Sequence, residues 1–217
     1  MYVSNGAYEQ FKEKIMENIW FIADTHFNHE SIIKHCKRPF SSIEEMNETL
    51  IRNWNDLVNR HDRIYILGDF AFSDHIKFID RLKGKKHLIK GNHDESSNEF
   101  YKRFESVSQI KTIEIEKKFF NLCHYPMRTW ESCYKGSILL YGHCHGRSES
   151  FNLSFDVGVD THNYKPYSYE EIKEMIMRRE EEMKKVHRII CDEKNNLQFF
   201  QDDVQYWKFL YKKASEK

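Results

Sequence analysis

The sequence predicts an α/β fold in which parallel strands alternate with helices, and three observations support this prediction. Short apolar runs that end abruptly in an acid, such as 18–24 and 63–69, are typical of buried strands. Between these runs, residues 41–60 show the periodicity of a helix with one apolar face. The 217 residues, of which 40% are hydrophobic and 31% charged, suit one domain with a substantial core.

The first elements follow one another closely. Residues 1–17 are expected to be a short amphipathic extension, and residues 18–24 (NIWFIAD) the first buried strand. In the helix expected at 41–60, Ser42 and Glu45 have the spacing of a capping box. Its apolar face consists of Ile43, Met46, Leu50, Trp54, Leu57 and Val58.

A second strand is expected at 63–69, a short helix at 74–82, and a third strand that ends in a polar segment at 85–94. This strand–helix–strand order predicts that the sheet begins with parallel strands. Residues 110–124 alternate on both sides of a Lys-Lys pair and predict a hairpin. Two further strands are expected at 137–143 and 154–160.

The pattern changes at Tyr167. Residues 169–187 predict a charged helix, 187–200 a hairpin and 202–213 an aromatic helix. We expect the first helix and the aromatic tail at 199–211 to pack on the main sheet, and an interface between copies of the chain is the alternative. The apolar face of this helix consists of Ile172, Met175, Ile176, Met183 and Val186.

Charge and cysteine content restrict the class of protein. Lys and Arg total 34, as do Asp and Glu, so no overall basic charge indicates nucleic-acid binding. The five cysteines are odd in number and form no CxxC pair, which favours reduced thiols in a cytoplasmic protein. The first residues contain no apolar stretch typical of a signal peptide or a membrane anchor.

Polar side chains follow the apolar runs at five places. In α/β sheets, ligand sites collect beyond the carboxyl ends of the strands, so these side chains are expected to meet. Carboxylate, amide and imidazole groups suit divalent ions that prefer oxygen and nitrogen. The neighbouring Cys123 and Cys144 are expected to be buried packing thiols that point away. The polar residues are Asp24 with His26, Asp69, Asn92 with His93, His124, and His143 with His145.

Five short blocks resemble the calcineurin-like metallophosphoesterases and occur in the order of that family. They are DTH (24–26), GDF (68–70), GNHD (91–94), CHYP (123–126) and GHCH (142–145). The stretch ADTHFNHESIIKHCKRPF is similar to a branch of small bacterial and phage phosphoesterases. The resemblance implies one domain over 1–217, a four-layer α/β/β/α sandwich with a motif core of about 18–165. A C-terminal helix–hairpin–helix extension of about 166–217 would follow.

The same resemblance implies two divalent metal ions, with manganese preferred and iron, zinc, nickel, cobalt or magnesium as alternatives. Asp69 would bridge the two ions, and His93 would be the catalytic histidine that binds no metal. The first ion would be held by Asp24, His26 and His145. The second ion would be held by Asn92, His124 and His143.

The block at Asp69 departs from the pattern of the phosphoprotein phosphatases, which is GDxxDRG. Here the sequence is GDFAFSD, and Phe72 stands where the second acid would be. The acidic partner of His93 is therefore missing from this loop, and Asp94 is the remaining candidate for a catalytic carboxylate. This departure favours a small phosphodiester or phosphomonoester over a phosphoprotein. A metal-bridging hydroxide would attack phosphorus, and an imidazolium at His93 would assist the leaving oxygen.

Three further residues are candidates for substrate contacts. Arg38 and Arg128 follow two of the blocks, and arginine binds phosphate oxygens through paired hydrogen bonds. A surface ion pair is the alternative for each arginine. His29 either lines the pocket or caps the next helix, and Asp156 and Asp160 either orient the ligand histidines or occupy turns.

Two other functions remain open for the sequence. A nuclease would use the same phosphodiester chemistry, although the chain lacks an obvious basic and aromatic strip. A metal-stabilised scaffold that binds a protein partner without catalysis is the second alternative, because fold alone does not prove function. Such a scaffold would have no need for His93. Neither the oligomeric state nor the physiological substrate follows from the sequence.

Overall fold

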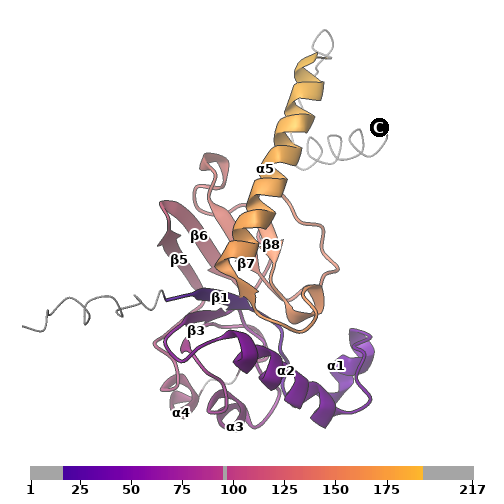
Figure 1. Ribbon diagram of the computed structural model, residues 1–217, viewed down its shortest axis with the longest axis vertical. Coiled ribbons are helices and arrows are strands. Elements are labelled where there is room, and N and C mark those ends of the chain that lie inside the picture. Colours follow the sequence, from indigo (N-terminus) through magenta and orange to yellow (C-terminus); the bar gives the residue numbers. More distant parts are fainter. Residues whose placement is uncertain (1–16, 95–96, 193–217) are drawn as a thin grey trace, which may run out of the picture.

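The protein contains two β-sheets packed face to face, shown in Figure 1 for a computed structural model that describes residues 17–94 and 97–192. The first sheet has the strand order β4-β3-β2-β1-β9. Strands β1 to β4 are parallel and β9 is antiparallel to β1, which confirms the predicted parallel start. The strands are β1 (Ile19–Ile22), β2 (Arg63–Ile66), β3 (Lys85–Ile89), β4 (Ser106–Ser108) and β9 (Tyr167–Ser168).

The second sheet has the order β5-β6-β7-β8 and contains the predicted hairpin. The hairpin turn lies at Glu116 and Lys117, one residue earlier than the predicted Lys-Lys turn, because Lys118 pairs with Ile115. Strands β6, β7 and β8 are parallel to one another. The strands are β5 (Ile110–Ile115), β6 (Lys118–Cys123), β7 (Ile138–Tyr141) and β8 (Ser154–Asp156).

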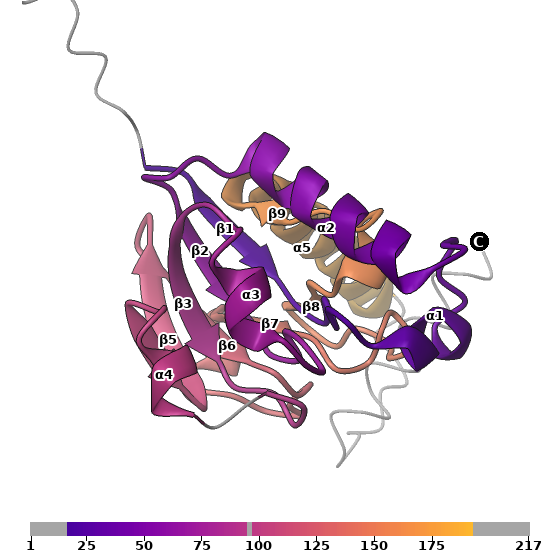
Figure 2. The same cartoon turned by 90° about the horizontal axis from the view of Figure 1, so that it is seen from below.

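Helices α2, α3 and α4 lie on the outer face of the five-stranded sheet, and α1 lies beyond the strands next to α2 (Figure 2). The longest is α2, in which the Ser42 hydroxyl accepts a hydrogen bond from the Glu45 amide, as expected for a cap. The Glu45 carboxylate accepts from the Ser41 amide, at 2.8 Å, which completes the cap one residue earlier than a standard capping box. The helices are α1 (Glu30–His35), α2 (Ile43–Leu57), α3 (His75–Ile79) and α4 (Asn98–Tyr101).

The main core lies between the two sheets. Phe21 of β1 and Leu67, which directly follows β2, meet Phe120 and Leu140 of the second sheet, and all four are fully buried. The helix α5 (Tyr169–Asp192) adds Ile172 and Ile176 to this core, as its predicted apolar face required. The opposite face of the second sheet is covered by the segment that contains the 3-10 helix η1 (Cys133–Lys135). The predicted α/β sandwich is thereby confirmed.

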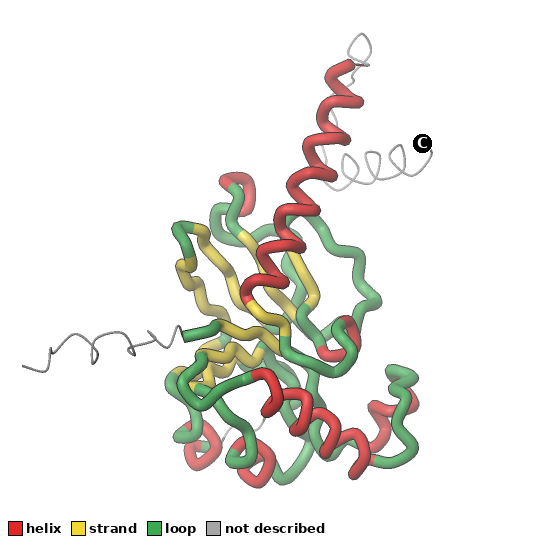
Figure 3. Tube along the Cα trace, viewed as in Figure 1, coloured by secondary structure: helices red, strands yellow, loops and turns green. Residues whose placement is uncertain are grey.

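The C-terminal prediction is only partly correct. Helix α5 continues to Asp192, so the hairpin predicted for 187–200 is wrong over 187–192 (Figure 3). The sequence HRIICD contains neither glycine nor proline, and adding a residue to an existing helix costs less than starting a new element. The extension predicted before residue 17 and the elements predicted after 192 lie outside the described residues. In the described part of the chain, no helix combines the length and apolar character that crossing a membrane requires.

Candidate metal centre

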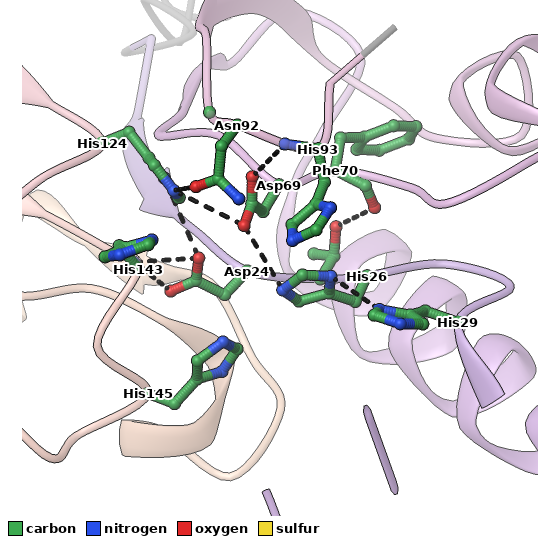
Figure 4. Close-up of polar contacts among 12 residues, drawn as sticks. Asp24, His26, His29, Asp69, Phe70, Asn92, His93, His124, His143 and His145 are labelled. Atoms are coloured by element: carbon green, nitrogen blue, oxygen red, sulfur yellow. Dashed lines mark hydrogen bonds and ion pairs between the residues drawn. The ribbon is translucent and has the colours of Figure 1, made fainter. Parts of the chain in front are cut away.

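The candidate ligands lie on loops at the carboxyl ends of five parallel strands, and the fold brings them together in one place (Figure 4). Three strands of the first sheet and two of the second contribute, so the centre spans the edge where both sheets end. The contributing strands are β1, β2, β3, β6 and β7, and the side chains they carry there are Asp24, His26, Asp69, Asn92, His124, His143 and His145.

The first group of ligand atoms belongs to Asp24, His26 and His145, whose candidate donor atoms lie within 4.8 Å of one another. The Nε2 atom of His26 is buried and belongs to the few such side-chain atoms of the described residues that lack a hydrogen-bond partner. It lies 3.6 Å from Oδ2 of Asp69. A buried nitrogen is seldom left unpaired, and a metal ion at this point would satisfy it.

The second group belongs to Asp69, His124 and His143, whose donor atoms also lie within 4.8 Å of one another. The Nδ1 atom of His124 lies 2.8 Å from the carbonyl oxygen of Leu67, which only accepts, so this nitrogen carries the proton. The Nε2 atom is therefore free to ligate, and it lies 3.2 Å from Oδ1 of Asn92. Asn92 thus adds an amide oxygen to the second group.

Asp69 lies between the two groups. Its Oδ2 atom is 3.6 Å from Nε2 of His26 and 3.5 Å from Nε2 of His124. Its Oδ1 atom accepts from the amide of His93 at 2.9 Å, which fixes the carboxylate. Burial alone would raise the pKa of Asp69, but the neighbouring His124, the hydrogen bond from the amide of His93 and the nearby His26 lower it to about 2. One ionised carboxylate therefore faces both groups.

Burial shifts the pKa values of two side chains in the first group. Burial raises the pKa of Asp24 to about 7, although both of its oxygens accept from the amide of His143, at 3.0 and 2.8 Å. Burial lowers the pKa of His26 to about 2, which keeps this imidazole neutral as metal binding requires. A divalent ion would stabilise the buried charge of Asp24.

Arg38 and Asp160 hold this group in place. The Nδ1 atom of His145 lies 2.7 Å from Asp160, and Arg38 donates two hydrogen bonds of 2.8 Å to the same carboxylate. Burial alone would lower the pKa of His145, but Asp160 and other neighbours raise it to about 10. Arg38 also donates to the carbonyl oxygens of Asp24 and Thr25, at 2.7 and 3.1 Å.

Arg38 is only 3% exposed, and its donors are occupied by these partners. The prediction that it binds substrate is therefore replaced by a positioning role, which the sequence did not indicate. Asp160 orients His145, which is one of the two roles considered for it. Asp156 accepts from the amides of Gly146 and Gly158, at 2.9 and 2.8 Å, and so holds the loops around the site.

Asp94 has a different role from the one predicted. Its carboxylate accepts hydrogen bonds from the backbone amides of Gly91, Asp69 and Phe70, at 2.7, 3.1 and 2.8 Å. These bonds tie the loop after β3 to the loop after β2. Asp94 therefore organises the backbone at the site instead of serving as the acidic partner of His93.

The remaining predicted residues lie at the rim. His93 is exposed, and its ring centroid is 5.6 Å from that of His26. The Nδ1 atom of His29 lies 3.2 Å from Nδ1 of His26, and its Nε2 atom lies 2.9 Å from the Ser31 hydroxyl. Both nitrogens of His29 thus have protein partners, which favours a role in orienting His26 over direct contact with substrate. Arg128 is exposed in the segment after β6, and its role stays a prediction.

The backbone at the centre is strained. A left-handed backbone is uncommon outside glycine, costs about 1–3 kcal/mol per residue, and clusters at functional sites. Close approach adds a second constraint, because a Cβ atom at Gly91 would lie 2.3 Å from Oδ1 of Asp69. Five candidate ligands have a positive φ angle: Asp24 (58°), His26 (50°), Asp69 (52°), His143 (70°) and His145 (50°).

Cys36 was not predicted to lie near the site. Its sulfur, a ring nitrogen of His145 and an oxygen of Asp160 lie within 4.8 Å of one another. No spacing in the sequence connects Cys36 with the His145 loop, so only the fold reveals this contact. Cys123 is buried as expected, whereas Cys144 is half-buried, which corrects the prediction that it packs in the core.

A two-sheet α/β sandwich with carboxylate, amide and imidazole groups gathered at its strand ends defines a class of proteins suited to divalent metals. The family model of the calcineurin-like phosphoesterase superfamily domain matches residues 16–153. The chain therefore belongs to the calcineurin-like phosphoesterase superfamily.

Three similar proteins carry names that state no activity. An uncharacterised protein of Methanocaldococcus jannaschii is 36% identical over 82% of this chain and 98% of its own length. The Gene 66 protein of Mycobacterium phage L5 is 26% identical over 60% of this chain and 78% of its own. A solved structure of a protein of unknown function from Aquifex aeolicus has a TM-score of 0.61 and 25% identity, and covers 73% of this chain and 99% of its own.

Proposed function

We propose that this chain is a metal-dependent hydrolase of small phosphodiesters or phosphomonoesters that uses two divalent ions. The observation that carries the proposal is the position of Asp69, whose Oδ2 atom faces Nε2 of both His26 and His124. Asp24, His26 and His145 would hold one ion, with Asp69 shared. Asn92, His124 and His143 would hold the other. Manganese is the first choice among the hard and borderline divalent ions that these donors suit.

Bound divalent ions would polarise a phosphoryl oxygen and lower the pKa of water. The residues of the chain would supply the proton for the leaving group and hold the loops in place. His93 lies beside His26 with its ring exposed, so it would hold a proton close to the leaving oxygen, a role typically worth about 10²–10⁴-fold in rate. The hydrogen bond from its backbone amide to Asp69 fixes its loop relative to the centre.

Two features support the substrate class and setting. Phe72 replaces the acid of the phosphoprotein phosphatase block, which favours a small phosphoester. The described cysteines are free thiols, which supports a reducing, cytoplasmic location.

The test is hydrolysis of bis-p-nitrophenyl phosphate against p-nitrophenyl phosphate by chelated protein that is resupplied with Mn²⁺. We expect turnover that requires the metal and is lost in Asp69→Asn. Asp62→Asn is the matched control, because Asp62 is an equally buried carboxylate that bonds Trp20 and Asn59, before β2 instead of after it. Absence of turnover in folded, metal-loaded wild type would contradict the proposal and favour the scaffold alternative. The preferred ester would separate a diesterase from a monoesterase.

A further inference from the structure

An exposed aromatic ring lies directly beside the candidate metal centre. Phe72 is 57% exposed, whereas its neighbours Phe70 and Ala71 are fully buried. Its ring stacks on that of His29, with centroids 4.5 Å apart and an angle of 11° between the planes. Because His29 covers one face and more than half of the side chain is exposed, the other face is open to a ligand.

The backbone at Phe72 is fixed by its surroundings, and its ring rests on that of His29. Its amide donates to the carbonyl oxygen of Phe27 at 2.8 Å, and Ala71 forms a parallel bridge with Phe27. The side-chain amide of Asn28 donates to the Ser73 hydroxyl at 2.7 Å. A ring that is held in place before a ligand arrives loses little conformational entropy on binding.

Phe72 is also within reach of the reaction centre. Its ring centroid lies 6.5 Å from that of His93. The ring of His29, on which Phe72 stacks, has its centroid 5.1 Å from that of His26. A phosphoester with its leaving oxygen at His93 would therefore extend its leaving group along the Phe72 ring. An apolar ring offers such a group no hydrogen bond, but it stacks on planar rings.

Tyr125 is a second exposed aromatic residue near the centre, and it contacts ligand residues that Phe72 does not. It is 43% exposed, its hydroxyl lies 3.4 Å from Oδ1 of Asn92, and its ring centroid lies 4.9 Å from that of His143. Its contacts are with the second group of ligands, so it is suited to holding those ligands in place. Phe72 is the ring that the site presents to a substrate.

We propose that Phe72 is a specificity-determining residue that stacks on a planar aromatic ring in the leaving group of the substrate. The substrate would then be a phosphoester of an aryl alcohol or of a nucleoside, which share this ring. The inference rests on the proposed function, because it takes the position of the leaving group from the role of His93. Stacking of a base on a protein aromatic ring is worth about 5- to 150-fold in affinity.

The test compares wild type with Phe72→Ala, Phe72→Leu and Phe72→Tyr on p-nitrophenyl, adenosine and glycerol esters of whichever phosphate class wild type hydrolyses. For each ester, dividing the kcat/KM of the variant by that of wild type cancels the intrinsic reactivity of the leaving group. We expect Phe72→Ala to lose about tenfold more kcat/KM on a ring-bearing ester than on the glycerol ester, through a higher KM. Phe72→Tyr should retain the preference, and Phe72→Leu should lose it.

The pattern of loss identifies the source of the ring. A loss confined to the p-nitrophenyl ester indicates an aryl substrate, and one confined to the adenosine ester indicates a nucleoside. Equal factors on all three esters would overturn the inference, as would a Phe72→Leu enzyme that behaves like wild type.

A binding measurement separates this inference from the proposed function. Phenylphosphonate and methylphosphonate are not hydrolysed and differ in the ring, and their affinities for the Mn²⁺-loaded protein can be measured by calorimetry. Failure of wild type to hydrolyse any ester would contradict the proposed function alone. A roughly tenfold preference for phenylphosphonate that Phe72→Ala removes would still support the ring site, whereas equal affinities would overturn it.

Discussion

Replacing Arg38 by methionine tests the positioning role of this residue, which the sequence did not indicate. The side chain of Arg38 is fully buried, and that of Asp160 is 8% exposed. The guanidinium bonds both oxygens of Asp160 and the carbonyl oxygens of Asp24 and Thr25. Methionine preserves much of the buried volume but removes all of these donors.

The expected loss follows from what remains unpaired. Asp160 bonds both Arg38 and His145, and it keeps only His145 in the variant. The carbonyl groups of Asp24 and Thr25 each lose a donor. Removing one member of a buried ion pair costs about 3–5 kcal/mol, and a buried acceptor left without a donor costs about 1–3 kcal/mol. Because the carbonyl groups can regain part of their bonding from water, we predict a loss of about 3–5 kcal/mol in the free energy of unfolding.

Urea denaturation of chelated protein, followed by tryptophan fluorescence, measures this loss without any contribution from metal. Arg81→Met is the matched control, because Arg81 bonds both oxygens of Glu48 at 2.7 and 2.6 Å but lies on the surface. Such a pair contributes about 0–1 kcal/mol. A loss for Arg38→Met no larger than that for Arg81→Met would refute the positioning role, and partial recovery in the Arg38→Met/Asp160→Leu protein would support it.

Three further predictions concern metal binding and stability. The pKa of His145 is raised to about 10 in the metal-free chain, so this imidazole is protonated at pH 7 and must lose its proton to bind a metal. Mn²⁺ affinity should therefore rise as the pH increases from 6 to 9. Calorimetry in buffers of different ionisation enthalpy should detect the released proton, and an affinity independent of pH would contradict this. Gly91→Ala should weaken Mn²⁺ binding more than tenfold, because its Cβ would collide with Asp69, and a wild-type Mn²⁺ affinity would refute this. Ser42→Ala should cost about 1 kcal/mol of stability through its lost bond to Glu45 and leave Mn²⁺ affinity unchanged, as urea denaturation and calorimetry can check.

The candidate ligands were predictable because the signal that marks them is local. Each follows an apolar run, and the carboxyl ends of parallel strands meet at one edge of a sheet. Asp69 and His124 illustrate this, since they lie far apart in the sequence. In the structure, Oδ2 of Asp69 is 3.5 Å from Nε2 of His124. The α/β alternation was predictable for the same reason, because the apolar runs of the buried strands and the 3.6-residue periodicity of the helices are both local features of the sequence.

The residues that support the ligands were not predictable from such signals. Arg38 and Asp160 are 122 positions apart, and an exposed substrate arginine has the same sequence context as a buried one. Asp94 follows His93 directly, but its carboxylate turns toward backbone amides of another loop. The continuation of α5 to Asp192 reflects helix propagation over residues that on their own also suit a strand.

The central claim is that two groups of side chains bind two divalent ions and share Asp69. Calorimetric titration of chelated protein with Mn²⁺ and, separately, with Zn²⁺ measures this directly. We predict two ions per chain for wild type and for Asp62→Asn, and weakened binding of both ions in Asp69→Asn. The claim would be contradicted if wild type bound fewer than two ions in both the Mn²⁺ and the Zn²⁺ titration. It would also be contradicted if Asp69→Asn bound two ions with wild-type affinity.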